Sequence, residues 1–366
     1  MDVGIANYPF TTIKPNSGIA YARRKCVDAE LGVRCNARNS LCRNGNRFVP
    51  VGVVDVAGLV PGASLGKGMG NQFLSDLISS NALIQVVDAT GRTDTEGNVS
   101  EGYDPANDVG MVIDEIGIWL RNIMLRNIGR KGKKTDGQAE IENLLLGFNI
   151  KKEVVQKALE RNSVDLAKEG IDEGALLSFS RELLRLSKPL VVAANKIDAA
   201  DEGSVDKIRG KLKGIDVIGC SAAIELALRK ADASGIIEYV PGDRDFRIKG
   251  TTDKEKADAL GYMRSFLARR GTGVQELIDH VTFRTMKKIV VYPVENEKEF
   301  TDHYGNVLPD ALLLDEGSTV YDLASSIHTD IAKNMLYAID AKRKIRISKT
   351  ARLNDGDVIK IVSAAK

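Results

Sequence analysis

The chain lacks the segments that would place it in a membrane or direct it out of the cell. Its 366 residues contain no apolar run of membrane-spanning length and no signal peptide at the amino end, so we expect a cytoplasmic protein without a membrane partner. The net charge is only +2, which neither demands nor excludes a nucleic-acid partner. With 43% hydrophobic and 28% charged residues, the chain has the composition of a globular protein, and its length favours two or three domains.

Cysteine is also scarce, and its four copies include no C-x-x-C pair. Cys26, Cys35 and Cys42 are separated by eight and six residues, which is not typical of a zinc site. Without a secretion signal we expect reduced thiols, and the sequence assigns these three no role. His303 and His328 stand alone, which favours a surface or structural histidine over a ligand.

Apolar segments that alternate with helical patterns predict a doubly wound α/β fold with a parallel sheet. The predicted strands are residues 51–55, 82–88, 188–194 and 216–220. Between the second and third of these strands, about 80 residues of mostly helical pattern are too many for an ordinary crossover. We therefore predict an inserted helical domain at residues 104–187. Its basic tip, residues 129–137, fits either a contact with RNA phosphates or a solvated turn.

The first of these strands ends in an acid. The valine run before Asp55 predicts a buried strand, and open α/β sheets bind ligands at the carboxyl ends of their strands. Gly58 follows three residues later. A carboxylate and a glycine at this spacing suit Mg²⁺ held on a nucleotide phosphate, because the glycine lets a backbone N–H approach the terminal phosphate. Alone the D-x-x-G pattern is weak, since both residue types are common where a strand meets a turn.

Two threonines, Thr11 and Thr12, follow a short loop that contains proline. A threonine hydroxyl in such a loop completes the coordination of Mg²⁺ in nucleotide switches when a γ-phosphate is present. Taken by themselves, the two threonines favour the simpler interpretation, the start of a strand.

Two later strand ends carry the argument for specificity. A carboxylate at Asp198 that accepts two N–H groups from a purine edge selects guanine, because adenine offers no matching pair of donors. Asn195 would brace the loop, and the stem of Lys196 would lie over the base. The backbone after the next strand would donate to the guanine oxygen, from Ser221, Ala222 and Ala223. N-K-x-D and S-A at successive strand ends, after D-x-x-G, together predict a guanine-nucleotide site.

Residues 288–363 form a separate unit in the sequence pattern. A strand is predicted at 289–294, and residues 312–314 form a short apolar segment. Residues 353–362 predict a turn followed by a final strand. Ser318 or Thr319 would cap one helix that runs from residue 320 to about residue 335. Strands around a single helix predict a small α+β fold of ubiquitin size, and no catalytic constellation appears in it.

The motifs at 7–16, 55–64, 195–198 and 221–223 (NYPFTTIKPN, DVAGLVPGAS, NKID and SAA) resemble those of the Obg-related GTPases. The helical insertion and the last segment resemble the YchF-type subgroup, particularly its archaeal members, whose terminal module is a TGS domain of the β-grasp fold. The resemblance implies a P-loop NTPase-like α/β fold. It also implies a GTPase domain at 1–103 and 188–287, a helical insertion at 104–187 and a TGS domain at 288–366.

The resemblance further implies a monomeric GTP-binding switch that hydrolyses GTP to GDP and phosphate and contacts the ribosome or RNA through its TGS domain and helical insertion. Thr12, or alternatively Thr11, would bind Mg²⁺ together with Asp55. The implied nucleotide-binding residues are Asp55, Gly58, Asn195, Lys196, Asp198, Ser221, Ala222 and Ala223. Many YchF relatives carry glutamate at the position of Asp198 and accept ATP, so the aspartate favours GTP.

No catalytic residue is implied by the resemblance. Leu59 stands where many GTPases have a glutamine that orients water, so hydrolysis would need another group, an ion or a partner.

One motif of the family has no counterpart in the sequence, because the 366 residues contain no G-x-x-x-x-G-K-[S/T]. In the family, a strand, the phosphate loop and a helix precede the NYPFTT segment, about 25 residues by usual element lengths. Without them the α- and β-phosphates lose their cradle and the sheet loses a central strand. We expect that the chain starts internally or derives from a segment-deleted copy. The alternatives are weak nucleotide binding in a non-hydrolysing RNA- or ribosome-binding adaptor, and an ATPase that prefers adenine.

Overall fold

The computed structural model describes residues 16–56, 61–62, 64, 77–78, 80–129, 137–162, 172–250 and 253–364. The chain divides into two units, one containing residues 54–226 with the first 18 residues and the other containing residues 19–53 and 227–366. The boundaries predicted for the GTPase, helical and TGS domains stay a prediction. Among the described helices, none has the length and apolar character that a membrane span requires.

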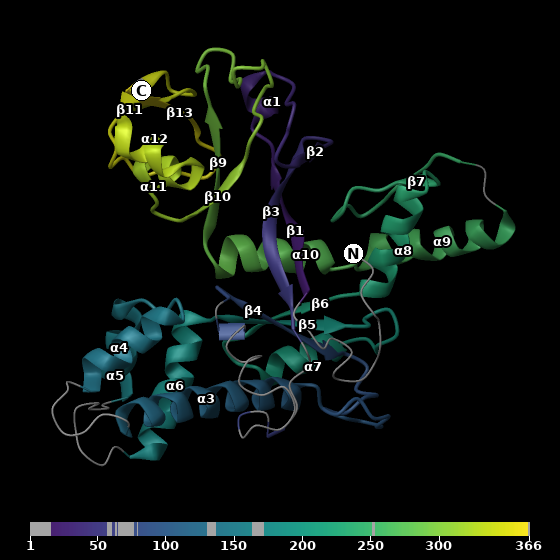
Figure 1. Ribbon diagram of the computed structural model, residues 1–366. Coiled ribbons are helices and arrows are strands. Elements are labelled where there is room, and N and C mark those ends of the chain that lie inside the picture. Colours follow the sequence, from purple (N-terminus) through teal and green to yellow (C-terminus); the bar gives the residue numbers. More distant parts are fainter. Residues whose placement is uncertain are drawn as a thin grey trace. The chain divides into compact units, whose positions relative to one another are not determined.

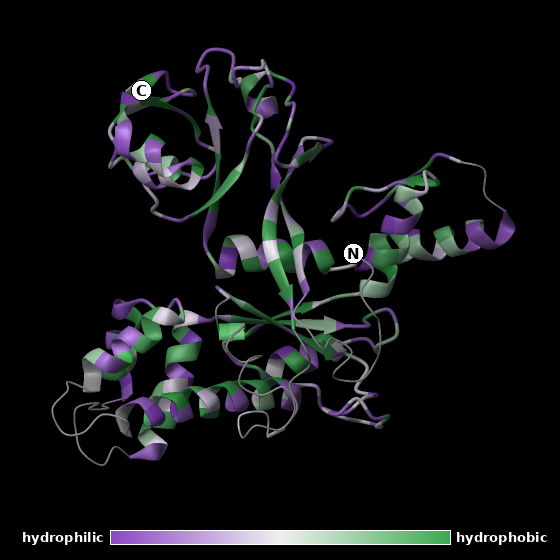
Figure 2. Cartoon of the chain, viewed as in Figure 1, coloured by the Kyte–Doolittle hydropathy of each residue, from purple (hydrophilic) through white to green (hydrophobic). Residues whose placement is uncertain are grey.

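Three strands of the first unit form a parallel sheet in the order β4-β5-β6. They are β4 (Leu83–Asp88), β5 (Leu190–Asn195) and β6 (Asp216–Gly219). The central strand β5 is buried from Val191 to Ala194, as its continuous apolar sequence requires, and Figure 2 shows hydrophobic residues along these strands. The predicted parallel sheet is confirmed. At its carboxyl edge, Asp88 lies in register with Asn195.

In the described part of the segment between β4 and β5, the chain forms four helices (Figure 1). They are α3 (Ala106–Gly129), α4 (Gly137–Gly147), α5 (Lys152–Asn162) and α6 (Glu173–Ser187). Their apolar faces share one core, in which Trp119, Val155 and Phe179 are fully or almost fully buried. Helix α6 begins after Asp172, whose carboxylate accepts hydrogen bonds from the first-turn N–H groups. The predicted helices of the insertion are thus confirmed, while its basic tip at 130–136 lies outside the described residues.

Further helices follow the two later strands of this sheet. They are α7 (Ser204–Lys211), α8 (Ala222–Ala233), α9 (Lys254–Arg269), α10 (Val274–Asp279) and the π-helical turn η2 (His280–Thr285). Between α8 and α9 lies a two-stranded antiparallel ribbon, β7 (Ile237–Glu238) with β8 (Arg247–Ile248).

The strands before Asp55 form a sheet of their own, in the order β1-β3-β2. They are β1 (Asn16–Lys25), β2 (Leu41–Arg43) and β3 (Asn46–Asp55), with the short helix α1 (Asp28–Leu31) between β1 and β2. Within the described residues, no strand joins this sheet to β4. The strand that ends at Asp55 was predicted to be buried, and this is wrong for its last residues. Val54 is 47% exposed, because β3 does not enter the parallel sheet.

The carboxyl-terminal sheet has five strands in the order β10-β9-β13-β11-β12. They are β9 (Lys288–Val294), β10 (Leu312–Asp315), β11 (Met335–Asp340), β12 (Ile345–Ile347) and β13 (Val358–Ser363). Strands β9 and β13 run parallel, and the other neighbours are antiparallel. The sheet is mixed, and the segment between β10 and β11 is helical. This arrangement agrees with the predicted β-grasp module.

The helical connection in this module differs from the single helix predicted to reach residue 335. Helix α11 (Val320–Ile327) starts at Thr319 with a capping box in which Thr319 and Asp322 bond each other's backbone N–H groups. It ends at His328, whose backbone is extended, and α12 (Thr329–Asn334) begins there. Met335 already belongs to β11. The prediction of one helix was wrong, because apolar spacing continued across a break in the backbone that no proline or glycine announces.

Candidate functional site

The loop after β5 brings the predicted purine-reading residues together at the carboxyl edge of the parallel sheet. The backbone N–H of Ile197 donates to the Cys220 carbonyl across 3.1 Å, and the N–H of Cys220 donates to the Ala194 carbonyl across 2.8 Å. These two bonds tie the start of the N-K-x-D loop to the end of β6. The two sequence motifs, separated by more than twenty residues, therefore meet as one constellation.

Side-chain hydrogen bonds then fix the polar residues of the two loops against each other. The Ser221 hydroxyl donates to Asp198 Oδ1 across 2.6 Å, and Asn195 Oδ1 accepts from the backbone N–H of Ala222 across 3.1 Å. Ser221 is fully buried and also accepts from the Ile224 N–H, at the start of α8. Asp198 and Asn195 are half-buried, whereas Ala222 and Ala223 are exposed. The carboxylate orientation is thus set by the protein before any ligand arrives.

Lys196 occupies an unusual backbone conformation within this loop. Its φ of 67° lies in the left-handed region, which costs free energy for a residue with a side chain. The ammonium donates to Asp88 Oδ2 across 2.8 Å and holds the side chain at the edge of the sheet. Asp88 also accepts from the hydroxyl groups of Thr90 and Thr93. Burial opposes ionisation of Asp88, but these bonds outweigh it and lower the pKa of the carboxyl group.

No role was predicted for Asp88, the last residue of the predicted strand at 82–88. The signal that identifies it is structural, because its partner Lys196 is 108 residues away in the sequence. The register of the two strands places Asp88 directly beside Asn195, and therefore next to the loop that contains Lys196.

A second carboxylate that sequence reasoning missed lies under the glycine-rich loop that follows Asp55. Glu115, on α3, accepts the backbone N–H of Gly62 across 2.6 Å and that of Ser64 across 2.8 Å. Its side chain is almost completely buried. Two charge-assisted bonds from one carboxylate therefore anchor this part of the loop to the helical insertion.

The predicted phosphate and metal residues are only partly within the described chain. Asp55 is the last residue of β3 and is exposed, as a ligand for a metal on a nucleotide must be. Thr11, Thr12 and Gly58 lie outside the described residues. The structure therefore brings Asn195, Lys196, Asp198 and the 221–223 loop together, and the Mg²⁺ site stays a prediction.

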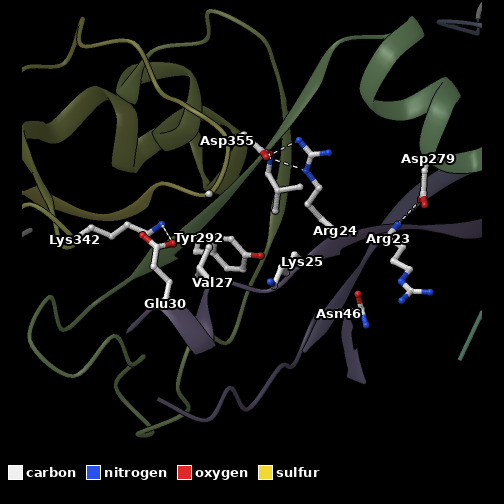
Figure 3. A pocket seen from close by; sticks show the side chains of 12 residues that line it. Arg23, Arg24, Lys25, Val27, Glu30, Asn46, Asp279, Tyr292, Lys342 and Asp355 are labelled. Atoms are coloured by element: carbon white, nitrogen blue, oxygen red, sulfur yellow. Dashed lines mark hydrogen bonds and ion pairs between the residues drawn. The ribbon is translucent and has the colours of Figure 1, made fainter. Parts of the chain in front are cut away.

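The cavity that is best defined among the described residues belongs to the second unit and is a different place. It has a volume of about 450 Å³ and is lined by both signs of charge, including Arg23, Arg24 and Lys342 (Figure 3). Two of its cations are in ion pairs, since Arg24 pairs with Asp355 at 2.7 Å and Lys342 pairs with Glu30 at 2.8 Å. The cavity holds none of the predicted nucleotide residues.

Comparison with known proteins agrees with the constellation at the sheet edge. Residues 193–296, which contain both motifs predicted to bind guanine, match the Obg-like GTPase YGR210-like, G4 motif-containing domain. Residues 304–363 match the TGS domain. The chain is 45% identical to an uncharacterized GTP-binding protein of Methanocaldococcus jannaschii over 99% of this chain and 93% of the relative. The chain belongs to the Obg-like GTPases.

Two further relatives connect this Obg-like GTPase to known folds and names. The crystal structure of a GTP-binding protein from Pyrococcus horikoshii superposes with a TM-score of 0.78 at 36% identity, over 95% of this chain and 93% of the other. A protein of Mycoplasma pneumoniae named ribosome-binding ATPase YchF is 29% identical over 71% of each chain. The matched segment begins in β5 and includes the loop where the structure brings Asn195 and Asp198 together with Ser221 and Ala222.

Proposed function

We propose that this Obg-like GTPase binds guanine nucleotides through the loops after β5 and β6 and acts as a GTP-hydrolysing switch. The observation that carries the proposal is the bond from Ser221 to Asp198, together with the bond from Ala222 to Asn195. A buried hydroxyl that holds one oxygen of a half-buried carboxylate has no evident purpose in packing. It does preorganise an acceptor for a ligand, which lowers the entropy lost on binding.

The chemistry of these groups matches guanine. An ionised aspartate is an acceptor only, and the N1–H and the exocyclic amino group of guanine are adjacent donors. The backbone around Ala222 and Ala223 supplies donors for the guanine oxygen. Adenine has an acceptor at N1 and would meet the Asp198 carboxylate with repulsion, which favours GTP over ATP.

For Mg²⁺ we propose Asp55 and Thr12 as ligands and Gly58 as the contact of the γ-phosphate. A carboxylate at a strand end and a hydroxyl in a loop are hard oxygen donors of the kind that Mg²⁺ prefers. GTP with Mg²⁺ would then order the two loops, and hydrolysis to GDP and phosphate would release them. Leu59 stands at the position where many GTPases have a glutamine that orients water, and its apolar side chain cannot do this. Another group, an ion or a partner would then accelerate hydrolysis.

For the partner we propose the ribosome or its RNA, reached in the cytoplasm by a monomeric protein. The name of the Mycoplasma pneumoniae relative supports this, as do the TGS match and the four basic residues of the insertion tip. These residues are Arg130, Lys131, Lys133 and Lys134.

A second candidate function rests on one specific observation. The 366 residues contain no G-x-x-x-x-G-K-[S/T], the sequence that cradles phosphates in P-loop proteins. The alternative function is a ribosome- or RNA-binding adaptor that keeps the guanine loops as scaffold and hydrolyses nothing.

Titration with a fluorescent GTP analogue that carries an N-methylanthraniloyl group separates the two functions. Binding with a dissociation constant in the micromolar range supports the switch if the constant rises when Mg²⁺ is removed. The absence of binding at millimolar nucleotide supports the adaptor. Competition with unlabelled GTP and ATP in the same cell tests the choice of base, since the proposed guanine site predicts that ATP displaces the probe far less well than GTP.

A further inference from the structure

Three of the four cysteines converge in the second unit, although their spacing in the sequence gave no indication of it. The sulfur atoms of Cys26, Cys35 and Cys42 and a carboxylate oxygen of Asp28 all lie within 4.8 Å of one another. Cys26 follows β1, Asp28 begins α1, Cys35 lies in the next loop and Cys42 lies in β2. None of the cysteines is in a disulfide.

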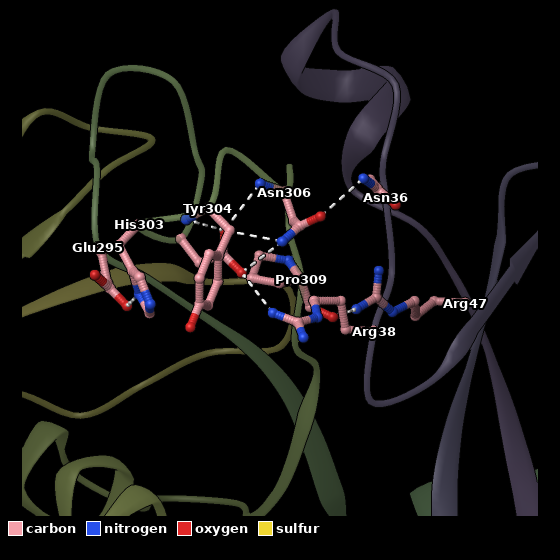
Figure 4. A network of polar contacts seen from close by, with 9 residues as sticks. Asn36, Arg38, Arg47, Glu295, His303, Tyr304, Asn306 and Pro309 are labelled. Carbon is pink, nitrogen blue, oxygen red and sulfur yellow. Dashed lines mark hydrogen bonds and ion pairs between the residues drawn. The ribbon is translucent and has the colours of Figure 1, made fainter.

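The backbone around the cluster is held by long-range hydrogen bonds. The N–H of Cys26 donates to the Gly45 carbonyl across 2.9 Å, which joins the end of β1 to the β2–β3 hairpin. In the loop of Cys35, the N–H of Asn36 donates to the Val307 carbonyl across 2.8 Å. The Asn36 side chain donates to Asn306 Oδ1 across 3.0 Å (Figure 4). The N–H of Arg38 donates to the Pro309 carbonyl across 2.7 Å. The sulfur positions are therefore fixed by the fold and not by flexible side chains meeting by chance.

A buried cation lies directly against the cluster. Arg47 is completely buried, and its guanidinium donates to Cys35 Sγ across 3.1 Å and to the Pro309 carbonyl across 3.0 Å. It lies opposite Cys42 in the β2–β3 ladder. A buried guanidinium needs negative charge nearby, because burying an unpaired charge costs several kcal/mol, on the order of the stability of a domain. Among the contacts of Arg47 with described residues, the Cys35 thiol can supply that charge as a thiolate, and the Tyr292 ring lies against the guanidinium.

We propose that Cys26, Cys35, Cys42 and Asp28 bind one Zn²⁺ ion in a closed, structural site. Zinc takes four ligands at tetrahedral angles with Zn–S distances of about 2.3 Å, which places sulfurs about 3.8 Å apart. Ligand atoms that all lie within 4.8 Å of one another match a single ion. Three thiolates and a carboxylate carry four negative charges, so the occupied site keeps a net negative charge that Arg47 balances in part, as a charged neighbour does around many metal sites.

The donor set also decides among metals. Three soft sulfur donors exclude Mg²⁺ and Ca²⁺, which take oxygen ligands. An iron–sulfur cluster binds its cysteines through separate iron atoms and spreads them further apart than one ion does. A disulfide between two of the thiols is the competing chemistry. It would leave the third thiol and Asp28 unexplained beside Arg47.

The consequence of this zinc site is a link between distant parts of the chain. Cys35 packs with Val27 and Val49 against Tyr292 and Leu308, in a core shared with the carboxyl-terminal module. A metal held by residues 26–42 would lock this amino-terminal segment into the shape that fits residues 290–311. Metal binding in such a site contributes directly to folding.

The test measures metal in the full chain, purified under reducing conditions without chelator. Mass spectrometry of the metal content should find about one zinc ion per chain, which remains after desalting. Cys35→Ser and the double variant Cys26→Ser/Cys42→Ser should each retain less than about a tenth of that amount. Cys220→Ser is the matched control, because Cys220 is the one cysteine of the sequence outside the cluster, and it should keep the full zinc content.

A second measurement uses the parent chain, so it does not depend on whether the cysteine variants fold. Titration of the metal-free parent chain with Co²⁺ should give the thiolate-to-cobalt charge-transfer absorption and the visible bands of a tetrahedral ion, with an endpoint at about one equivalent. Asp28→Asn, which keeps the three thiols, should bind Co²⁺ at least tenfold more weakly. Parent protein that holds no zinc after exposure to excess Zn²⁺ would overturn the proposal. The isolation of a Cys–Cys disulfide from protein kept under reductant would do the same.

Discussion

The Lys196 ammonium lies 2.8 Å from the Asp88 carboxylate, so a salt bridge joins the ends of β4 and β5. The Asp88 side chain is only 10% exposed, whereas Lys196 is 37% exposed. Lys196 also has a left-handed backbone at φ 67°. A lysine held at both its backbone and its tip has little freedom left. Its aliphatic stem is therefore available as a fixed surface, which is what stacking over a base requires.

Asp88→Asn should weaken this arrangement, because the amide cannot form the charge-assisted bond to Lys196 and can accept only part of the hydroxyl bonds from Thr90 and Thr93. We expect a loss of about 1 kcal/mol of unfolding free energy and weaker binding of the fluorescent GTP analogue. Urea unfolding and the nucleotide titration measure the two effects. If Asp88→Asn is fully folded and binds the nucleotide as tightly as the parent, the ion pair with Asp88 is not needed to position Lys196.

The stability effect of Asp88→Asn should depend on pH. The pKa of Asp88 is below its ordinary value of 3.8, so the unfolded chain binds more protons near that pH than the folded chain. The stabilisation by Asp88 is therefore present above about pH 4 and lost as the pH falls below it. The difference in melting temperature between parent and variant should shrink in that acid range. A difference that stays constant down to pH 3 would contradict this assignment.

Glu115→Gln should loosen the loop at residues 61–64. The amide oxygen can replace only one of the two bonds to the N–H groups of Gly62 and Ser64, and the charge is lost. We expect a cost of about 1–3 kcal/mol. Hydrogen exchange at these two amides should become much faster.

Asp114→Asn is the matched control for this prediction, since Asp114 lies next to Glu115 on α3. Its carboxylate is half-exposed and pairs with Arg181 at 2.7 Å. A surface pair of this kind contributes little, so its loss should cost less than about 0.5 kcal/mol and leave the exchange of Gly62 and Ser64 unchanged. Equal effects of the two substitutions would show that Glu115 has no special hold on the loop.

Asp279 should make the protein less stable as the pH rises through the weakly acidic range. Burial raises its pKa from 3.8 to about 6, although the backbone N–H of Arg23 and the amide of Gln275 donate to it. Between about pH 4 and 6 the folded chain binds more protons than the unfolded one, so the unfolding free energy falls as the pH rises.

Asp279→Asn keeps the acceptor oxygen and stays neutral, which removes this dependence. The melting temperatures of parent and variant should be similar near pH 4. Between about pH 4 and 6 the melting temperature of the variant should rise relative to that of the parent, and above about pH 6 the difference should stay constant. Parallel curves from pH 4 to 7 would show that Asp279 is ionised in the folded protein throughout.

Patterns that are local in the sequence predicted the fold well. Continuous apolar runs with acids or amides at their ends gave β4 and β5, and helical spacing gave α3 to α6, because these elements are set by neighbouring residues. The burial of Val54 depends on which strand lies beside β3, and local pattern carries no such information.

Residues of the candidate site could be predicted from the sequence where they lie in one contiguous motif. Residues that act through partners far away in the sequence could not be predicted. Asn195 and Asp198 lie within one tetrapeptide, and Ser221 follows the end of the next strand, β6. Glu115 and Asp88 act through partners that only the folded chain brings near, and the cysteine cluster escapes the spacing rules for the same reason. Those rules describe ligands on one short loop or hairpin. Cys26, Cys35 and Cys42 come from a strand end, a loop and a second strand.

Exchange of the carboxylate of Asp198 for an amide tests the central claim most directly. Asp198→Asn replaces one of two acceptors by a donor, which complements the N–H and the carbonyl oxygen that xanthine presents where guanine has two donors. The control is Asp201→Asn, an exposed carboxylate three residues further on. Labelled GTP and XTP are titrated into parent, variant and control. A guanine site predicts that Asp198→Asn alone shifts the preference toward XTP by more than about tenfold. An unchanged ratio of the two affinities in Asp198→Asn would contradict the assignment of a guanine pocket to these loops.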